Sequence, residues 1–431
     1  MLNADGAVQN IHLHSKSIHQ DYLLLALSLI LQIVLGVILG HAYDIRIFMA
    51  TGYLVGTGQD PYIAQNLSAL FHNSTFQGIS SVGYPPPWAL VLGLLYLASY
   101  KIIPNLLLYN FAIKIPIIAA NICLAYLVAK ILKKLGVDER TARKAWLFMI
   151  FNPLLLFATS AWGQFDSIVA LFSLLALLLL SDGKLAGSAL LLVLAISFKP
   201  TALPLIPAVF ITLLGRSFRS MFRYFGVFLT AVLLLFVGPF VLFRWDPTPI
   251  FQHWNAHFTV AGGLSFMTFQ ELLKNSYQLP GQWWLVGLLW VPALVIATFV
   301  LKPGGEGLVS LLKKSVAMTM VFFLFRTWLS ETNIILVLPM MLILVSVGEL
   351  DGRALTAVWV LPLAFSLFNT SMFQLFFPSL PALMDRLLHL SDVFRTARLF
   401  LRIIVVIPWL IAGGWIALGC FKEKPVDKIP A

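Results

Sequence analysis

The sequence predicts an all-α polytopic membrane protein with about twelve transmembrane helices and a long polar segment after the first of them. Of its 431 residues, 60% are hydrophobic and 11% are charged, and the mean hydropathy is +0.90. A water-soluble core cannot enclose that much apolar surface, so the surplus must face lipid. The apolar stretches are long runs and not short alternating segments, which favours helices over a transmembrane barrel.

The first apolar run, Tyr22–His41, has about the twenty residues that cross a bilayer. No small-residue cleavage site follows it, so we expect a retained span and not a removed signal peptide. A polar segment, Tyr43–Trp88, comes next. The later runs that we interpret as spans are Leu106–Leu132, Ala145–Ala161, Ser167–Leu180, Leu185–Phe198, Thr201–Leu214, Tyr224–Phe243, Trp284–Leu301, Ser315–Leu329, Ile334–Val347, Ala354–Phe377 and Phe400–Phe421.

Lysine and arginine collect in four segments, which the positive-inside rule places in the cytoplasm. These basic segments are Lys130–Lys144, Gly215–Arg223, Leu301–Lys314 and Phe421–Lys428. The net charge of +11 therefore reports membrane topology and does not indicate nucleic-acid binding. The opposite, extracytoplasmic side receives Asp44–Trp88, Trp162–Asp166, Lys199–Pro200, Arg244–Trp283, Ser330–Asn333 and Pro378–Leu399.

Two segments fit this topology poorly. Pro87–Ser99 is apolar but short, and we expect an interfacial or re-entrant helix there. Met384–Arg402 carries four arginines on the predicted outer side, which an amphipathic helix lying on anionic headgroups would explain. A miscounted span would explain the same arginines.

Each predicted outer loop places polar residues beside an apolar run. Asp44 follows the first span as either a solvated loop residue or a base at the membrane surface. The stretch WGQFDS supplies Gln164 and Asp166 beside Trp162, where the alternative is an interfacial tryptophan followed by an ordinary polar turn. Lys199 precedes a proline, so the helix should break there and direct the ammonium at an anion; a snorkelling lysine is the alternative.

The later outer loops offer a second group of candidates. Arg326, Glu331 and Asn333 lie at one hairpin, where the arginine and the glutamate have the alternative of pairing with each other. Arg244 and His257 lie in the long outer segment, where lone histidines are usually solvated. Together these residues suggest chemistry on a lipid-linked, anionic substrate at the outer surface.

Several ordered motifs resemble those of membrane-embedded GT-C glycosyltransferases. They are YDIRIFMATGYLVGTGQDPY, GYPPPW, FNPLLLFATSAWGQFDS and FKPTALPLIP. They are most similar to bacterial mannosyltransferases related to the eukaryotic glycosylphosphatidylinositol mannosyltransferases, and the likeness runs from about Tyr43 to Pro207. It implies one integral-membrane domain over residues 22–421, with a GT-C-like module at 22–214, a more variable module at 215–421, and cytoplasmic tails at 1–21 and 422–431.

The resemblance also implies a polyprenyl-phosphate sugar donor, a glycolipid or glycan acceptor, and catalysis at the outer face of the cell membrane with inversion. Asp44 would be the catalytic base, although the position two residues later, where a second carboxylate is common, holds Arg46. Lys199, Arg326 and Arg244 would bind the donor phosphate. Sugar or acceptor contacts would come from Gln164, Asp166, Tyr84, Glu331, Asn333 and His257.

No cofactor is expected. The two cysteines, Cys123 and Cys420, have no metal-ligand or disulfide spacing, and the chain has no phosphate-binding glycine loop. A lipid or small-molecule transporter or flippase is the competing function, but it would place charged residues in mid-span, where Lys114 is the main example. A non-catalytic subunit of a glycan-assembly complex is a third possibility, whose signature would be a missing base.

Overall fold

The computed structural model describes residues 4–64, 66–273, 281–301 and 307–422, and nearly all of their regular structure is helical. The helices of the first half are α1 (Ala4–Ile38), α2 (Ala42–Gly56), η1 (Ser74–Phe76), α3 (Pro86–Ala98), α4 (Leu106–Lys134), α5 (Glu139–Phe151), α6 (Pro153–Leu156), η2 (Phe157–Ala161), α7 (Asp166–Ser181), α8 (Leu185–Phe198), η3 (Pro200–Ala202) and α9 (Leu205–Leu214).

In the second half, two short strands accompany the helices. The elements are α10 (Phe218–Val232), η4 (Leu233–Val237), α11 (Gly238–Phe243), α12 (Thr248–Thr259), β1 (Gly262–Gly263), η5 (Phe266–Leu273), η6 (Gly281–Leu288), α13 (Trp290–Val300), α14 (Leu308–Phe325), β2 (Trp328–Leu329), η7 (Glu331–Leu336), α15 (Leu338–Ser346), α16 (Gly352–Phe368), η8 (Thr370–Leu375), α17 (Pro381–Val393) and α18 (Arg395–Phe421).

Six helical segments within the described residues are long and apolar enough to cross a membrane: His19–Ile38, Leu106–Lys134, Glu139–Ala161, Phe218–Phe243, Leu308–Phe325 and Arg395–Phe421. Seven shorter apolar helices accompany them: Pro86–Ala98, Asp166–Ser181, Leu185–Phe198, Pro200–Leu214, Leu285–Val300, Glu331–Ser346 and Gly352–Phe368. At about 1.5 Å per residue, helices of 10–17 residues are shorter than a hydrocarbon core of about 30 Å. The all-helical membrane fold is confirmed, whereas the count of about twelve spans is not.

Large apolar side chains cover the outside of the bundle. Phe222 on α10, Val241 on α11 and Phe299 on α13 are all more than 70% exposed. The interior is also apolar, and every residue of α15 from Leu338 to Leu344 is buried. A bundle that is hydrophobic both inside and outside is suited to lipid and not to water.

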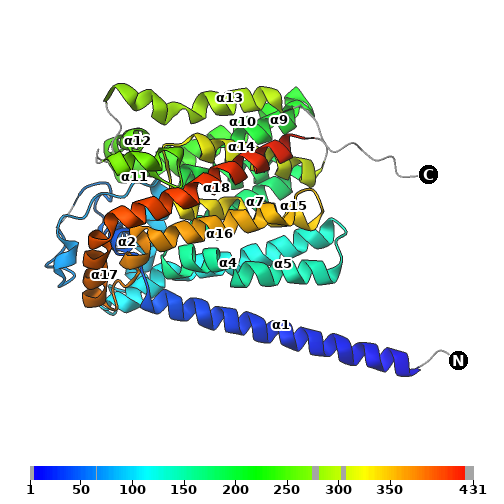
Figure 1. The fold of residues 1–431 in the computed structure, drawn as a ribbon, viewed down its shortest axis with the longest axis horizontal. Coiled ribbons are helices and arrows are strands. Elements are labelled where there is room, and N and C mark those ends of the chain that lie inside the picture. Colours follow the sequence, from blue (N-terminus) through cyan, green and yellow to red (C-terminus); the bar gives the residue numbers. More distant parts are fainter. Residues whose placement is uncertain (1–3, 65, 274–280, 302–306, 423–431) are drawn as a thin grey trace.

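The helices lie side by side along the long axis of the molecule (Figure 1). Helices α2, α12 and α17 gather at one end, and both chain termini point toward the other. At the terminal end, ion pairs join segments that are apart in the sequence: Lys134 with Asp182, Arg143 with Asp21, and Lys313 with Glu349.

The two segments of uncertain topology have different outcomes. Helix α3, which covers the apolar run at 87–99, has 13 residues and packs against α2, α4 and α8, so it is too short for a full crossing. The expectation of one amphipathic helix over Met384–Arg402 is wrong. The chain breaks at Phe394, between α17 and α18, and Arg402 is 4% exposed and lines an internal cavity, because its side chain finds an acceptor on Asn369 there.

Candidate active site

A cavity of about 650 Å³ lies at the end of the bundle where α2 and α12 are found. Its walls come from parts of the chain that are far apart in sequence, including the start of α2, the loop after η2, the α8–η3 junction, the end of α14, η7 and the start of α18. Only the folded bundle brings these parts together. The cavity is lined by both ionisable and apolar side chains.

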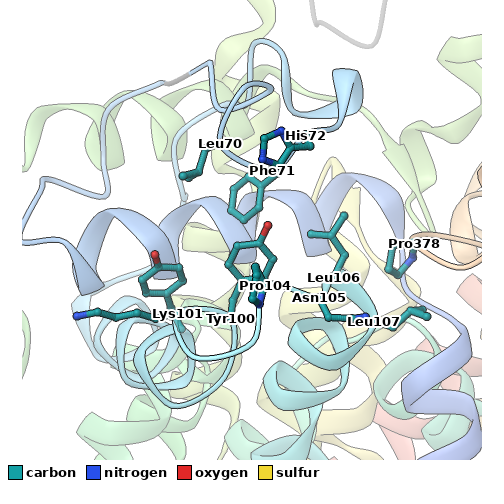
Figure 2. Close-up of a pocket in the computed structure, with 11 residues that line it drawn as sticks. Leu70, Phe71, His72, Tyr100, Lys101, Pro104, Asn105, Leu106, Leu107 and Pro378 are labelled. Atoms are coloured by element: carbon teal, nitrogen blue, oxygen red, sulfur yellow. The ribbon is translucent and has the colours of Figure 1, made fainter.

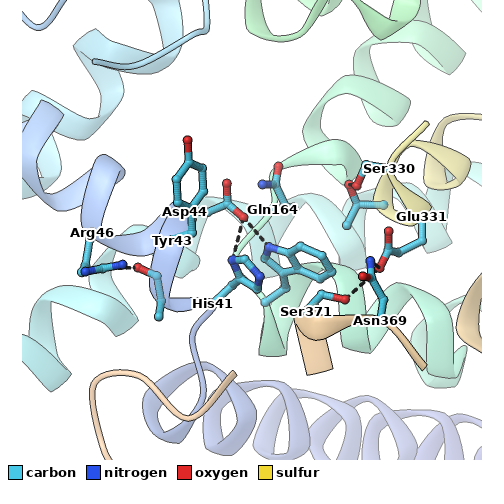
Figure 3. A network of polar contacts seen from close by, with 12 residues as sticks. His41, Tyr43, Asp44, Arg46, Gln164, Ser330, Glu331, Asn369 and Ser371 are labelled. Atoms are coloured by element: carbon cyan, nitrogen blue, oxygen red, sulfur yellow. Dashed lines mark hydrogen bonds and ion pairs between the residues drawn. The ribbon is translucent and has the colours of Figure 1, made fainter. Parts of the chain in front are cut away.

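Asp44 lies in the first turn of α2 and faces this cavity. Its Oδ2 accepts a hydrogen bond of 2.6 Å from the indole Nε1 of Trp162, and His41 Nδ1 lies 3.0 Å from the same oxygen, an ion-pair distance without the alignment of a hydrogen bond (Figure 3). The His41 ring stacks on the indole with ring centroids 4.3 Å apart. Both contacts end on Oδ2, so neither side chain occupies Oδ1.

The environment keeps Asp44 ionised. Burial raises the pKa of this carboxyl, but the contacts with His41, Trp162 and Gln164 outweigh burial, and the net pKa lies below its usual value. Tyr84, opposite, behaves differently: burial and the nearby charges of Asp44 and Asp166 raise the pKa of its phenol well above the ordinary range. Tyr84 therefore keeps its proton and remains a hydrogen-bond donor.

The local backbone explains how Trp162 reaches Asp44. The helix that begins at Pro153 changes to π-helical geometry over Phe157–Ala161, a distortion that often occurs at functional sites. Gly163 follows with φ +98°, a conformation that glycine tolerates best. The amide of His41 then donates to the Trp162 carbonyl at 3.0 Å, which joins this turn to the start of α2.

Lys199 lies on the same cavity but already has buried partners. Helix α8 ends at Phe198 and Lys199 is extended, so the helix break predicted from Pro200 is confirmed. Its Nζ donates to Asp166 Oδ2 at 2.7 Å and to Gln164 Oε1 at 3.1 Å. The two charged side chains are 8% and 1% exposed, which makes this a buried ion pair.

Glu331 organises the opposite wall. Its Oε1 accepts hydrogen bonds from Ser371 at 2.9 Å and from Asn369 at 3.2 Å (Figure 3). It also accepts one from Ser366 at 3.2 Å. Pairing between Arg326 and Glu331, the alternative left open by the sequence, does not occur among the described contacts. Arg326 instead lies over the Phe322 ring, 5.0 Å from its centroid, and lines the cavity.

The remaining predicted site residues fall into three groups. Tyr84 and Asn333 line the cavity, and the Oδ1 atom of Asn333 is buried without a hydrogen-bond partner among the described residues. Arg244 does not join them: it ends α11 in a left-handed conformation (φ +57°), is exposed and is not part of the cavity wall. The side chain of His257 lies outside the described residues, whereas the neighbouring His253 and Trp254 reach the cavity.

Sequence reasoning missed four side chains of this site. The sequence analysis places His41 at the end of a span, Arg402 in a segment on the membrane surface, and Asn369 and Ser371 inside a predicted span. Arg402 donates from Nη1 to Asn369 Oδ1 at 3.1 Å, and Asn369 in turn contacts Glu331, so the three form one connected network. The cluster of arginines at the start of α18 was a signal for Arg402, but no spacing linked it to residues 30 or more positions away.

A second hollow, of about 620 Å³, lies between the 70–72 loop and the α3–α4 connection (Figure 2). Aromatic rings of Phe71, Tyr96 and Tyr100 form much of its wall, with Lys101 at the side. No carboxylate contributes to it. Neither hollow includes a group of three or more histidine, cysteine or acidic residues suited to a metal ion, as far as the described residues extend.

The model of glycosyltransferase family 87 matches residues 83–327, more than half of the chain. The matched region contains Tyr84, Gln164, Asp166, Lys199 and Arg326, whereas Asp44, Glu331 and Arg402 lie outside it. No curated protein matches the chain. A family of enzymes favours catalysis over transport, and the GT-C resemblance seen in the sequence is confirmed. The chain belongs to glycosyltransferase family 87, a family of the GT-C type, and is a membrane glycosyltransferase.

Proposed function

We propose that the protein transfers a sugar, mannose by resemblance, from a polyprenyl-phosphate donor to a lipid-linked or glycan acceptor at the extracytoplasmic face of the cell membrane. The observation that carries the proposal is Asp44. It is a carboxylate in a largely apolar cavity, kept ionised by Trp162 and His41, and it shares that cavity with cationic side chains from three other segments.

Asp44 acts as the general base. Its Oδ1 removes the proton from the acceptor hydroxyl, and the hydroxyl oxygen attacks the anomeric carbon of the donor sugar. The bond between that carbon and the phosphate oxygen breaks, and the electron pair leaves with the polyprenyl phosphate. A single attack from the face opposite the phosphate inverts the configuration at the anomeric carbon.

Arg326 and Arg402 bind the leaving phosphate, with help from Lys199. Arg326 has no carboxylate partner among the described contacts, which makes its guanidinium the strongest candidate for an incoming anion. Lys199 holds Asp166 and Gln164, so an ammonium with three donors has one N–H left for phosphate. Charge that develops on the phosphate is stabilised most where water is excluded.

Sugar hydroxyls contact the polar groups around these charges. Gln164 lies on one side, while Glu331 and Asn333 lie on the other. Asp166 does not line the cavity, so it acts on the substrate only through Lys199, which it holds. Tyr84 donates from its protonated phenol. His257 stays a predicted contact. The apolar part of the wall, which includes Trp254, Trp290 and Phe322, suits the first isoprene units of the donor lipid.

The test is a transfer assay with purified protein in liposomes. Polyprenyl-phosphate mannose, other polyprenyl-phosphate sugars and a nucleotide-linked mannose are each offered with a lipid extract as the acceptor pool. We expect product only from a polyprenyl-phosphate sugar, and its mass identifies the acceptor. Product from the nucleotide-linked donor alone would refute the proposed donor class.

The assay is repeated with Asp44→Asn, which keeps the shape of the side chain but cannot take up the proton. The transfer rate should fall by about 10²–10⁴-fold, the usual contribution of a general base. Asp60→Asn is the matched control, because Asp60 is in the same outer segment but only accepts from the amides of Tyr62 and Asp246. We expect it to retain transfer. A rate near wild type for Asp44→Asn would remove Asp44 from the chemistry.

A further inference from the structure

Lys114 is a fully buried lysine in the first third of the long helix α4. Its Nζ donates to two backbone carbonyls, those of Leu39 and Ala161, the second at 2.9 Å. Among the described residues it takes part in no ion pair. A buried ammonium costs several kcal/mol unless its protons are satisfied, and in a membrane helix it is usually functional. The proposed reaction does not use Lys114, which leaves its presence unexplained.

The two carbonyls belong to the two segments that hold Asp44. Leu39 lies two residues before His41, and Ala161 directly precedes Trp162. The His41 amide bonds to the Trp162 carbonyl, and both side chains contact Asp44 Oδ2. One ammonium thus ties together the end of α1 and the end of η2 at the point where they meet behind the carboxylate.

Two further contacts fix this arrangement. Asn110, one helical turn before Lys114, donates to the carbonyls of Gly36 and Leu39 at 2.9 Å each, and so satisfies the last turn of α1. Gly163 packs directly on the lysine stem: a Cβ atom there would lie 3.1 Å from Lys114 Cε and 2.5 Å from Ile45 Cδ1. The loop that carries Trp162 therefore has little freedom to shift while Lys114 is in place.

We propose that Lys114 is a positioning residue, which holds His41 and Trp162 against Asp44 by binding the Leu39 and Ala161 carbonyls. This inference rests on the proposed function of Asp44 as the base. The titratable and polar groups around Asp44 come from several elements: His41 from the preceding turn, Tyr43 from α2, Tyr84 from the outer loop and Gln164 from the loop after η2. The Asp166–Lys199 pair lies behind Gln164. Loss of the ammonium takes its donor from the buried Ala161 carbonyl, leaves the Leu39 carbonyl with Asn110 alone, and lets the His41–Trp162 pair move.

The first measurement is independent of catalysis. Lys114→Met removes the ammonium and keeps an unbranched side chain, and hydrogen exchange is followed in a peptide that spans residues 36–45. We expect the His41 amide to exchange at least about tenfold faster, because its acceptor is no longer held. Asn121→Leu is the matched control. Asn121 is also fully buried on α4 and donates to Gln32 and Thr159 at 2.8 Å, but it lies about 10 Å further along the helix.

The second measurement is the pH profile of transfer. In Lys114→Met the acidic limb of the pH profile of kcat/KM should move to higher pH by about one pH unit, because the contacts that favour ionised Asp44 are weakened. The value of kcat should fall by about 10²-fold, with little change in the donor KM. Asn121→Leu should lower stability without moving the acidic limb. If Lys114→Met does not fold, Lys114→Gln keeps an N–H donor group on a shorter side chain and should show the same shifts to a smaller extent.

Unchanged exchange at residues 36–45, or an acidic limb that stays in place, would overturn the positioning role. A loss of rate and stability that Asn121→Leu reproduces in full would assign Lys114 a purely structural role. Failure of the proposed function looks different: Asp44→Asn would then keep its activity, while the exchange measurement would still report whether Lys114 holds His41.

Discussion

At the scale of single residues, the indole of Trp162 controls the protonation of Asp44. Trp162→Phe keeps a ring to stack on His41 but removes the N–H that donates at 2.6 Å. The indole N–H is one of the contacts that lower the pKa of the Asp44 carboxyl against burial, so its loss raises that pKa. Because the base must be ionised, we expect the acidic limb of kcat/KM to move to higher pH by about one to two units, the value of a charge-assisted hydrogen bond.

The profile is measured over the acidic range with a saturating acceptor. Trp254→Phe serves as the control, because Trp254 lines the cavity but donates its indole N–H to the Gly83 carbonyl and not to Asp44. Its acidic limb should match that of the wild type. A limb that does not move in Trp162→Phe would mean that the indole does not stabilise the ionised carboxylate.

Arg402 is the residue whose role differs most from its first interpretation. Its guanidinium lies 5.6 Å over the Phe365 ring, donates to Asn369 and reaches the cavity that we assign to the donor phosphate. We expect Arg402→Met to lower kcat/KM for the donor by about 10–100-fold, which corresponds to the loss of one charge-assisted contact. The acceptor KM should change much less.

Arg398→Met, one turn earlier on α18, is the matched control for this prediction. Arg398 donates to the carbonyls of Ser391 and Phe368 and does not line the cavity. It should retain donor kinetics within about twofold, as expected for a contact remote from the substrate. Equal losses in the two variants would indicate that the start of α18 has only a structural role.

At the scale of elements, the Lys199–Asp166 pair ties the end of α8 to the start of α7. Removing one partner leaves a buried charge without compensation, so Lys199→Met and Asp166→Leu should each lower the free energy of unfolding by about 3–5 kcal/mol. The double variant should be more stable than either single one, because it leaves no unpaired charge. Unfolding of all three in one detergent gives the coupling between the two side chains.

The same variants separate structure from substrate binding. If Lys199 also contacts the phosphate, Lys199→Met weakens use of the donor more than use of the acceptor. The double variant should then recover stability but not donor affinity. Recovery of both would show that Lys199 serves only to neutralise Asp166.

Elements and site residues were predictable from the sequence to different degrees. Leu185–Phe198 was predicted with the observed bounds, because a charged turn and Lys199-Pro200 end the apolar run on either side. The π-helix at Phe157–Ala161 leaves no such mark in the sequence, since it depends on packing against α1 and α4.

Among the site residues, Asp44, Lys199 and Glu331 stood out in the sequence as charges beside apolar runs. Arg402 and Asn369 did not stand out, because only helix packing brings α16 and α18 onto the cavity. Arg244 was predicted to bind phosphate but does not line the cavity, because a charge beside a span does not reveal the direction of its side chain.

At the scale of the whole molecule, the cavity and the basic loops lie at opposite ends of the bundle. Asp44, Glu331 and the cationic side chains of the cavity lie at the end of the bundle where α2 is found. The α4–α5 and α7–α8 turns lie with the chain termini at the other end (Figure 1). Lysine and arginine are retained on the cytoplasmic side during insertion. The arrangement therefore predicts a cavity that opens away from the cytoplasm.

Cysteine labelling tests this orientation directly. Cys123 and Cys420 are first replaced by serine, and single cysteines are then introduced at Gln77, in the exposed outer segment, and at Arg140, exposed at the start of α5. A membrane-impermeant maleimide should label Gln77→Cys on intact cells and Arg140→Cys only after the membrane is opened, because the two positions face different compartments. The reverse pattern would place the cavity in the cytoplasm and favour a cytoplasmic sugar donor. Labelling of both positions on intact cells would mean that the chain crosses the membrane with a different number of spans between residues 77 and 140.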